Sequence, residues 1–155
     1  MREVSTFAEI EDEFLARVRT MVYCRAATID VDQRPRSRVL HPVWEDRTGW
    51  VTTGPKTAKA AQLALNPFMS LAFIADPFKP VYVECLATWQ NDPDTRLRIW
   101  DLYKKFDVDL SISWGDVESS IYAVLRLEPW RIELYDLLNQ SNRKVWQNDQ
   151  EVKLT

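Results

Sequence analysis

The chain has 155 residues, the size of a single domain, and 46% hydrophobic and 28% charged residues place it in the ordinary globular range. Its three scattered glycines cannot form a dinucleotide-binding G-x-G-x-x-G or a phosphate loop, and one histidine with two cysteines is too few for a four-ligand zinc site. The net charge of −3 argues against a nucleic-acid-binding protein, which would need surplus Lys and Arg to meet phosphates.

The chain shows no segment that would hold it in a membrane. The longest apolar run, residues 67–75, is less than half of the roughly 20 residues that a spanning helix needs. We therefore expect a cytoplasmic protein with no membrane partner. In a reducing compartment Cys24 and Cys85 are expected to act as small buried hydrophobic residues.

The first third of the chain predicts one helix followed by strands. Thr6 and Glu9 have capping-box spacing, and apolar residues then recur at helical intervals, which predicts a helix over residues 6–21. From residue 22 the period changes to two, and this indicates a strand that ends in a polar turn over residues 30–35. Two further strands are predicted at residues 36–44 and 50–53, separated by a turn that ends at Gly49.

The rest of the chain mixes strands with two more helices. An Ala- and Leu-rich segment predicts a helix that begins near Thr57 and stops before Asn66-Pro67. Asp92-Pro93 is a good helix start, and the apolar spacing after it predicts a helix over residues 93–106. Strands are predicted at residues 68–75, 81–89, 121–127 and 131–136, and residues 107–120 remain ambiguous.

This order of elements does not alternate strand and helix in the way that a parallel α/β sheet requires. Six or seven short strands joined mostly by turns favour a mainly β protein with peripheral helices, in the α+β class, built on an antiparallel barrel. We assign residues 1–139 to this domain and residues 140–155 to a polar C-terminal tail that is expected to be loosely held.

Basic and hydroxyl side chains are concentrated between Arg36 and Lys59. Arg36 and Arg38 share one strand face with Leu40, and the next helix start is rich in Thr and Lys. Unpaired N–H groups and the helix dipole favour an anion at such a start, so the segment is able to hold a phosphate. The alternative interpretation is a solvated basic face with hydroxyls that cap the helix.

The same segment resembles a known family. The order RPRSRVLHPVWEDRTGWVTTGPKTAKAAQLALNPFMSLAF, residues 34–73, looks like the flavin-binding core of the pyridoxamine-phosphate-oxidase-like split-barrel family. EPWRIELYD, residues 128–136, is similar to the closing strand of that family. Together with the preceding helix and strand, residues 6–31, and the strands between the two segments, the likeness covers residues 6–136.

The resemblance implies a homodimer of antiparallel split β-barrels with FMN bound between the subunits. In this likeness Arg38 matches an arginine that meets the flavin phosphate, and Thr57 and Lys59 match the hydroxyl and lysine of the phosphate clamp. Val39 and Leu40 match a strand along the isoalloxazine ring, and Thr52 and Thr53 match a pair at the end of the next strand. The implied cofactor-binding residues are therefore Arg38, Val39, Leu40, Thr52, Thr53, Thr57 and Lys59.

The chain also departs from the family pattern. Ala58 and Val43 stand where the full-length oxidases carry basic residues, and the segment from Gln140 to Asn148 lacks the Arg-x-His signature that holds the vitamin B6 phosphate there. We therefore expect an FMN-dependent oxidoreductase that is not a pyridoxamine phosphate oxidase. Two alternatives stay open: a deazaflavin-dependent reductase of the same fold, and a flavin-binding, stress-related module without turnover. His41 either contacts the cofactor or a substrate, or is structural.

Overall fold

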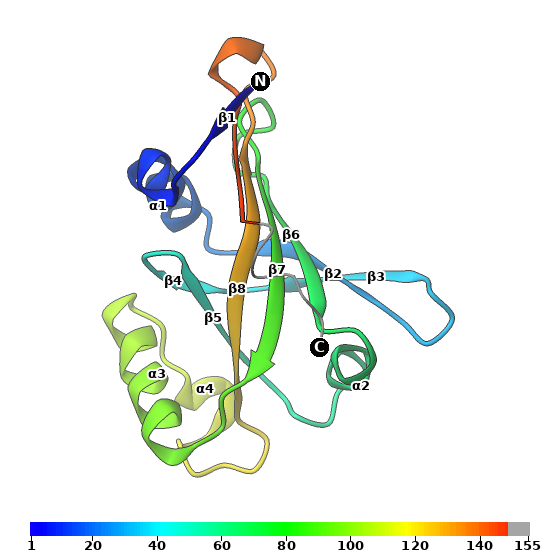
Figure 1. Cartoon of the computed structure of the whole chain (residues 1–155). Coiled ribbons are helices and arrows are strands. Elements are labelled where there is room, and N and C mark those ends of the chain that lie inside the picture. The colour runs from blue at the N-terminus through cyan, green and yellow to red at the C-terminus, as the bar shows by residue number, and fades with distance from the viewer. Residues whose placement is uncertain (149–155) are drawn as a thin grey trace.

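The computed structural model of the chain describes residues 1–148 and contains one open, strongly bent sheet with helices at its periphery (Figure 1). Neighbouring strands run in the order β1-β9-β8-β7-β6-β2-β3, and β5 adds to β8 and carries β4. Every pairing is antiparallel except that of β1 with β9. The strands are β1 (Arg2–Val4), β2 (Cys24–Ile29), β3 (Pro35–Leu40), β4 (Val43–Glu45), β5 (Thr48–Thr53), β6 (Phe68–Phe73), β7 (Val81–Trp89), β8 (Ala123–Leu134) and β9 (Lys144–Gln147).

Four α-helices flank this sheet, so the expected mainly β class with peripheral helices is confirmed. They are α1 (Glu11–Thr20), α2 (Ala58–Leu65), α3 (Pro93–Lys105) and α4 (Ser111–Trp114). The start predicted at Thr6 is present as a short 3-10 helix over Phe7–Glu9, in which the Glu9 carboxylate accepts the Thr6 N–H at 3.1 Å. None of the helices within residues 1–148 is long and apolar enough to cross a membrane.

The strand predicted over residues 36–44 is two strands, β3 and β4, separated by His41 and Pro42. Proline has no N–H for a sheet hydrogen bond, and the chain changes direction there. As a result β3 pairs with β2, whereas β4 forms a hairpin with β5. The break therefore puts the beginning of the predicted basic segment, at Arg36, in a different hairpin from β5, the strand that leads to Lys59.

The two strands predicted at residues 121–127 and 131–136 are a single strand, β8. Its pairing with β7 shifts register between Glu84 and Cys85, at the level of Pro129. The shift leaves Trp130, the residue after Pro129, without a partner on β7, and prolines within strands are found at such bulges. The prediction that a strand ends before Pro129 is therefore wrong.

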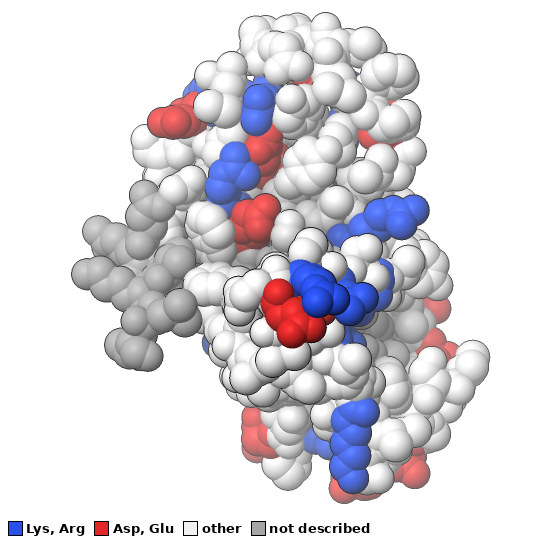
Figure 2. Space-filling view, turned by 90° about the vertical axis from the view of Figure 1, so that its right-hand side faces the viewer, with Lys and Arg blue, Asp and Glu red and all other residues white. Residues whose placement is uncertain are grey.

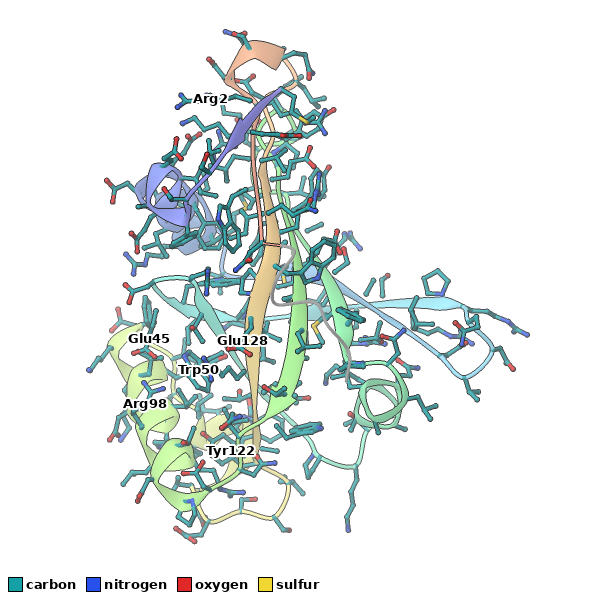
Figure 3. All side chains as sticks on the ribbon, viewed as in Figure 1. Arg2, Glu45, Trp50, Arg98, Tyr122 and Glu128 are labelled. Carbon is teal, nitrogen blue, oxygen red and sulfur yellow. The ribbon has the colours of Figure 1, made fainter. Side chains whose placement is uncertain are left out.

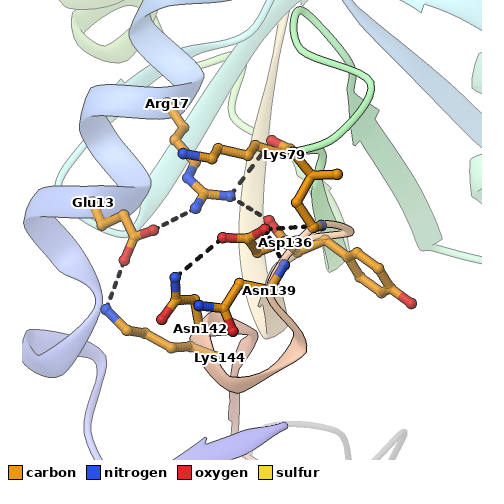
Figure 4. A network of polar contacts seen from close by, with 9 residues as sticks. Glu13, Arg17, Lys79, Asp136, Asn139, Asn142 and Lys144 are labelled. Atoms are coloured by element: carbon orange, nitrogen blue, oxygen red, sulfur yellow. Dashed lines mark hydrogen bonds and ion pairs between the residues drawn. The ribbon is translucent and has the colours of Figure 1, made fainter.

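The expectation of a loosely held tail is wrong for residues 140–148. Residues 144–147 form β9, which pairs with both β8 and β1, and Trp146 on it is 3% exposed. The Lys144 ammonium donates to the Glu13 carboxylate on α1 at 2.7 Å, and the Asn142 amide donates to Asp136 at 3.3 Å (Figure 4). The domain boundary at residue 139 stays a prediction, and residues 149–155 lie outside the described part.

Two apolar cores lie on opposite faces of β5. The larger core fills the barrel and includes Val51, while the smaller one packs α3 against β4 and β5 and includes Trp50. Arg98 on α3 lies over the Trp50 ring and donates to Glu45 at 2.7 Å, which fastens the helix to the hairpin (Figure 3). Residues that alternate along β5 therefore face either the barrel or the helices.

Candidate functional site

The structure brings Arg38 and Lys59 together beside the barrel. Arg38 extends from β3 and donates to the Thr28 hydroxyl at 2.7 Å and to the Gln62 amide oxygen at 2.9 Å. Lys59, in the first turn of α2, donates from its ammonium to the Thr53 hydroxyl at the end of β5. Two cations from separate elements thus lie in one polar cluster, and their hydrogen-bond acceptors in the described part of the chain are all uncharged.

The charge of this pair has no counterion among residues 1–148. Lys59 is only 6% exposed, and no ion pair involving Lys59 or Arg38 occurs in the described part of the chain. Burial, and then the nearby Arg38 guanidinium, lower the pKa of Lys59 to about 8, and burial also lowers the pKa of Arg38. A buried cation without a carboxylate is costly, so the cluster favours an added anion.

Thr57 caps the helix that carries Lys59. Its hydroxyl accepts the Ala60 N–H at 3.2 Å and donates to the Gly54 carbonyl at 3.2 Å, so it caps α2. An N-cap hydroxyl of this kind fixes where the helix begins and hence where the first-turn Lys59 points. In this structure Thr57 therefore positions the lysine.

The predicted threonine pair is divided between the two faces of β5. Thr53 points to the barrel side and contacts Lys59, whereas the Thr52 hydroxyl accepts the indole N–H of Trp114 at 3.3 Å on the helical side. Successive side chains of a strand point to opposite faces, so the two threonines do not share one contact surface.

Val39 and Leu40 divide in the same way. Leu40 is half-buried against the barrel core, while Val39 is 60% exposed on the outer face of β3. β3 is an edge of the sheet, because β2 is its only strand partner among residues 1–148. The structure leaves the outer face at Val39 open.

The other basic residues of the predicted segment lie away from this cluster or are paired. Arg36 donates to the Asp30 carboxylate at 2.9 Å, and Lys56 is exposed before α2. Val43 is buried in the helix-side core, and Ala58 is exposed at the start of α2. Arg38 and Lys59 are therefore the two cations of the segment that the fold joins.

Sequence reasoning missed Thr28 and Gln62, the two acceptors of Arg38. The Thr28 hydroxyl also donates to the Gln62 amide oxygen at 2.6 Å, which completes a three-residue network. A signal for Thr28 was present, since it is the polar residue at an inward position of an alternating strand. Gln62 lies three residues after Lys59, a spacing that puts both on one helix face.

His41 lies outside the cation cluster. Its ring contacts Tyr23 and Tyr103, with centroid distances of 5.3 and 5.7 Å, and its backbone carbonyl accepts the Tyr103 hydroxyl at 2.6 Å. Burial lowers the pKa of the His41 imidazole, which favours the neutral form at pH 7. These contacts fit a structural role. Both cysteines are buried and unpaired, as expected.

Solved structures with low sequence identity share this fold. A pyridoxamine 5'-phosphate oxidase-related, FMN-binding protein from Nostoc punctiforme is 20% identical, with 96% of this chain and 94% of that chain covered and a TM-score of 0.66. A protein from Clostridium acetobutylicum related to general stress protein 26 is 15% identical, with 92% and 96% covered and a TM-score of 0.74. An F420 reductase is 18% identical, with 76% and 93% covered and a TM-score of 0.63.

No family model and no curated protein matches the chain. The structural matches give it the split-barrel fold of the pyridoxamine-phosphate-oxidase-like proteins, so the resemblance seen in the sequence is confirmed as a fold.

The buried charge of Lys59 makes a prediction about stability. Replacing Lys59 by Met removes the ammonium but keeps a similar length, so the cofactor-free protein should become more stable at pH 7, by about 1–3 kcal/mol. Because the pKa is lowered in the folded state, the cost of the charge is fully present below about pH 8 and declines as the pH rises through that value. Urea unfolding should therefore show a smaller difference at pH 9.5.

The matched control is Lys105→Met, which removes an exposed ammonium on α3 and should change stability little at either pH. A Lys59→Met protein that is less stable than the wild type at pH 7, or a difference that does not narrow with pH, would contradict the unpaired buried charge.

Proposed function

We propose that this chain, which has the fold of the pyridoxamine-phosphate-oxidase-like split barrels, is an FMN-dependent oxidoreductase that holds the cofactor phosphate with Arg38 and Lys59. The observation that carries the proposal is the pair formed by the buried Lys59 and the half-buried Arg38, whose hydrogen-bond acceptors are all neutral in the described residues. A phosphate monoester dianion is the ligand whose charge matches that pair.

The residues present fit a phosphate in number and kind. Arg38 offers planar guanidinium donors and Lys59 a compact ammonium, and hydrogen bonds between charged groups are the stronger class. Val43 and Ala58 add no positive charge, so the proposed clamp has two cations. Thr28, Gln62 and Thr53 hold the two cations in place before the anion arrives.

A bound flavin supplies hydride or electron transfer, and the protein contributes binding, orientation and shielding from water. In this proposal Arg38 and Lys59 fix the phosphate end, and the exposed outer face at Val39 is the part of β3 available to the ring system.

The proposed clamp predicts a preference for FMN over riboflavin, which lacks the phosphate. Isothermal titration should show FMN binding at least about tenfold tighter, a difference of about 1.4 kcal/mol. Lys59→Met should weaken FMN by about 1.5–3 kcal/mol and leave riboflavin unchanged. Lys105→Met serves as the control with unchanged affinities. Equal affinity of the wild type for FMN and riboflavin would exclude a phosphate clamp.

Two other functions use the same site. A deazaflavin-dependent reductase is supported by the match to an F420 reductase, and a stress-related module without turnover by the match to a protein related to general stress protein 26. A clamp of only two cations favours weaker cofactor retention, as such a module would show.

Two measurements separate these functions. The absorption spectrum and mass of the copurified cofactor separate FMN from deazaflavin, and stopped-flow reduction by nicotinamide cofactors separates an enzyme from a module.

We propose that the chain works as a homodimer. The β2–β3 hairpin extends away from the body of the molecule and leaves the edge strand β3 without a second neighbour (Figure 1). Val39 is exposed on its outer face and lies opposite the exposed Arg25 of β2, and the nearby outer-face residues Ala27 and Ala72 are small and only half-buried. On the side that carries this hairpin and α2, a central cluster of basic and acidic side chains is surrounded by larger uncharged areas (Figure 2). Such a surface suits a second copy of the chain.

Sedimentation equilibrium at micromolar concentration should give twice the chain mass of 18.2 kDa. Val39→Asp puts a charge on the proposed interface and should shift the protein toward monomer, whereas Leu97→Asp, on the exposed side of α3, should leave the dimer intact. A wild-type mass near 18.2 kDa would contradict the dimer.

We also propose that the protein does not oxidise pyridoxamine phosphate at a useful rate. Arg143, the candidate cation in the C-terminal segment, donates to the Glu133 carboxylate at 2.6 Å and lies over the Tyr135 ring at 4.3 Å. Lys144 is paired with Glu13. Both cations therefore have carboxylate partners, and a substrate phosphate would have to displace them. Pyridoxal phosphate formation by the FMN-loaded protein at about one turnover per second or faster would show this wrong.

A further inference from the structure

A pocket lies on the helical side of β5, beside the start of α2. It has a volume of about 260 Å³ and opens between the β5–α2 connection and the segment after α3. Gly54, Pro55, Lys56 and the α2 cap Thr57 line one side, and Trp114, Ser120 and Ile121 line the other. Thr52 faces this side, and Thr53 faces Lys59.

Hydrogen bonds on the side facing away from the pocket hold its lining residues in place. The Trp114 indole N–H donates to the Thr52 hydroxyl, so the ring is tied to β5. Arg96 on α3 donates to three carbonyls of the segment that carries Ser120 and Ile121: Val117 at 2.6 Å, Ser119 at 2.9 Å and Tyr122 at 2.9 Å. A guanidinium bonded to three backbone oxygens fixes the path of this loop.

Arg96 is in turn fixed by Tyr122. The guanidinium lies over the Tyr122 ring at 4.9 Å, and the Tyr122 hydroxyl donates to the Arg96 carbonyl at 2.9 Å. Tyr122, labelled in Figure 3, packs against Trp100 of α3 and against Trp114 in the helix-side core. The pocket is therefore preformed, and a ligand would not have to order it, which lowers the entropic cost of binding.

The chemistry of the lining combines an apolar wall with one cation. Ile121 is 56% exposed although the loop beneath it is held in place, and the half-buried Trp114 adds an aromatic surface. Lys56 at the rim is exposed and makes no ion pair in the described part of the chain. Small-molecule sites typically have this composition, with apolar walls and a few polar groups that orient the ligand.

We propose that this pocket binds a planar apolar molecule that carries a carboxylate, with the ring system against Trp114 and Ile121 and the carboxylate at Lys56. We assign this molecule as the organic substrate, an assignment that rests on the proposed flavin function. The pocket itself rests only on the contacts described above. Arg96 is a positioning residue here, because it acts on the pocket through the loop.

Two probes of the same shape test the charge and the apolar wall separately. 2-Naphthoate and 2-naphthylmethanol share a planar ring system, but only the first carries a carboxylate. Titration of the full chain followed by NMR should show naphthoate shifting the Trp114 indole N–H resonance, which is assigned by its loss in Trp114→Phe. The alcohol should bind at least about tenfold more weakly. In Lys56→Met the two probes should bind equally, whereas Lys105→Met should keep the tenfold difference.

Equal binding of both probes to the wild type, or naphthoate binding that survives Lys56→Met unchanged, would overturn the proposal.

The same titration in the presence of saturating FMN shows whether the pocket stays free when the cofactor is bound. Retained naphthoate binding supports a substrate pocket, and lost binding would show that the pocket belongs to the cofactor. A chain that takes naphthoate but no FMN would support the pocket while overturning the flavin function, so the two failures are distinguishable.

Discussion

One electrostatic constraint dominates this protein: Lys59 is buried beside Arg38 without a carboxylate partner among residues 1–148. Neutral acceptors on Thr28, Thr53 and Gln62 accept hydrogen bonds from the two cations, but they do not neutralise the positive charge. Burial and mutual repulsion lower the pKa of Lys59 to about 8, which shows the cost of keeping two cations together. A fold that keeps this cost in its free state is arranged for an anion, since the anion removes the cost when it binds.

The fold creates this constraint through the docking of α2 on the β2–β3 hairpin. Thr57 sets the start of α2 and so directs Lys59 inward, while the pairing of β2 with β3 puts Arg38 next to Thr28. The alternation of β5 then gives the site two sides, with Thr53 at the cation pair and Thr52 at the Trp114 pocket. One short strand thereby separates a site for an anion from a preformed apolar site.

Local signals in the sequence were sufficient for most elements and for the two cations. Capping residues and apolar periodicity located α1, α2 and α3, and the family-like order of residues pointed to Arg38 and Lys59. Sequence could not divide the threonine pair or find Gln62, because those contacts depend on how α2 docks. It also misread β8, where a bulge accommodates Pro129, and β9, because the polar segment that contains it is held by partners far away in the chain, such as Glu13 and β1.

The most direct test of the central claim is the number of protons taken up when FMN binds. Titration calorimetry at pH 8.5–9, in buffers of different ionisation enthalpy, measures that number. The FMN phosphate is already a dianion there, since its second pKa is about 6, so any uptake comes from the protein. The account predicts net proton uptake, because the anion restores the ammonium of Lys59, and no uptake in Lys59→Met. Binding without proton uptake, or uptake that persists in Lys59→Met, would contradict the placement of the phosphate at Lys59.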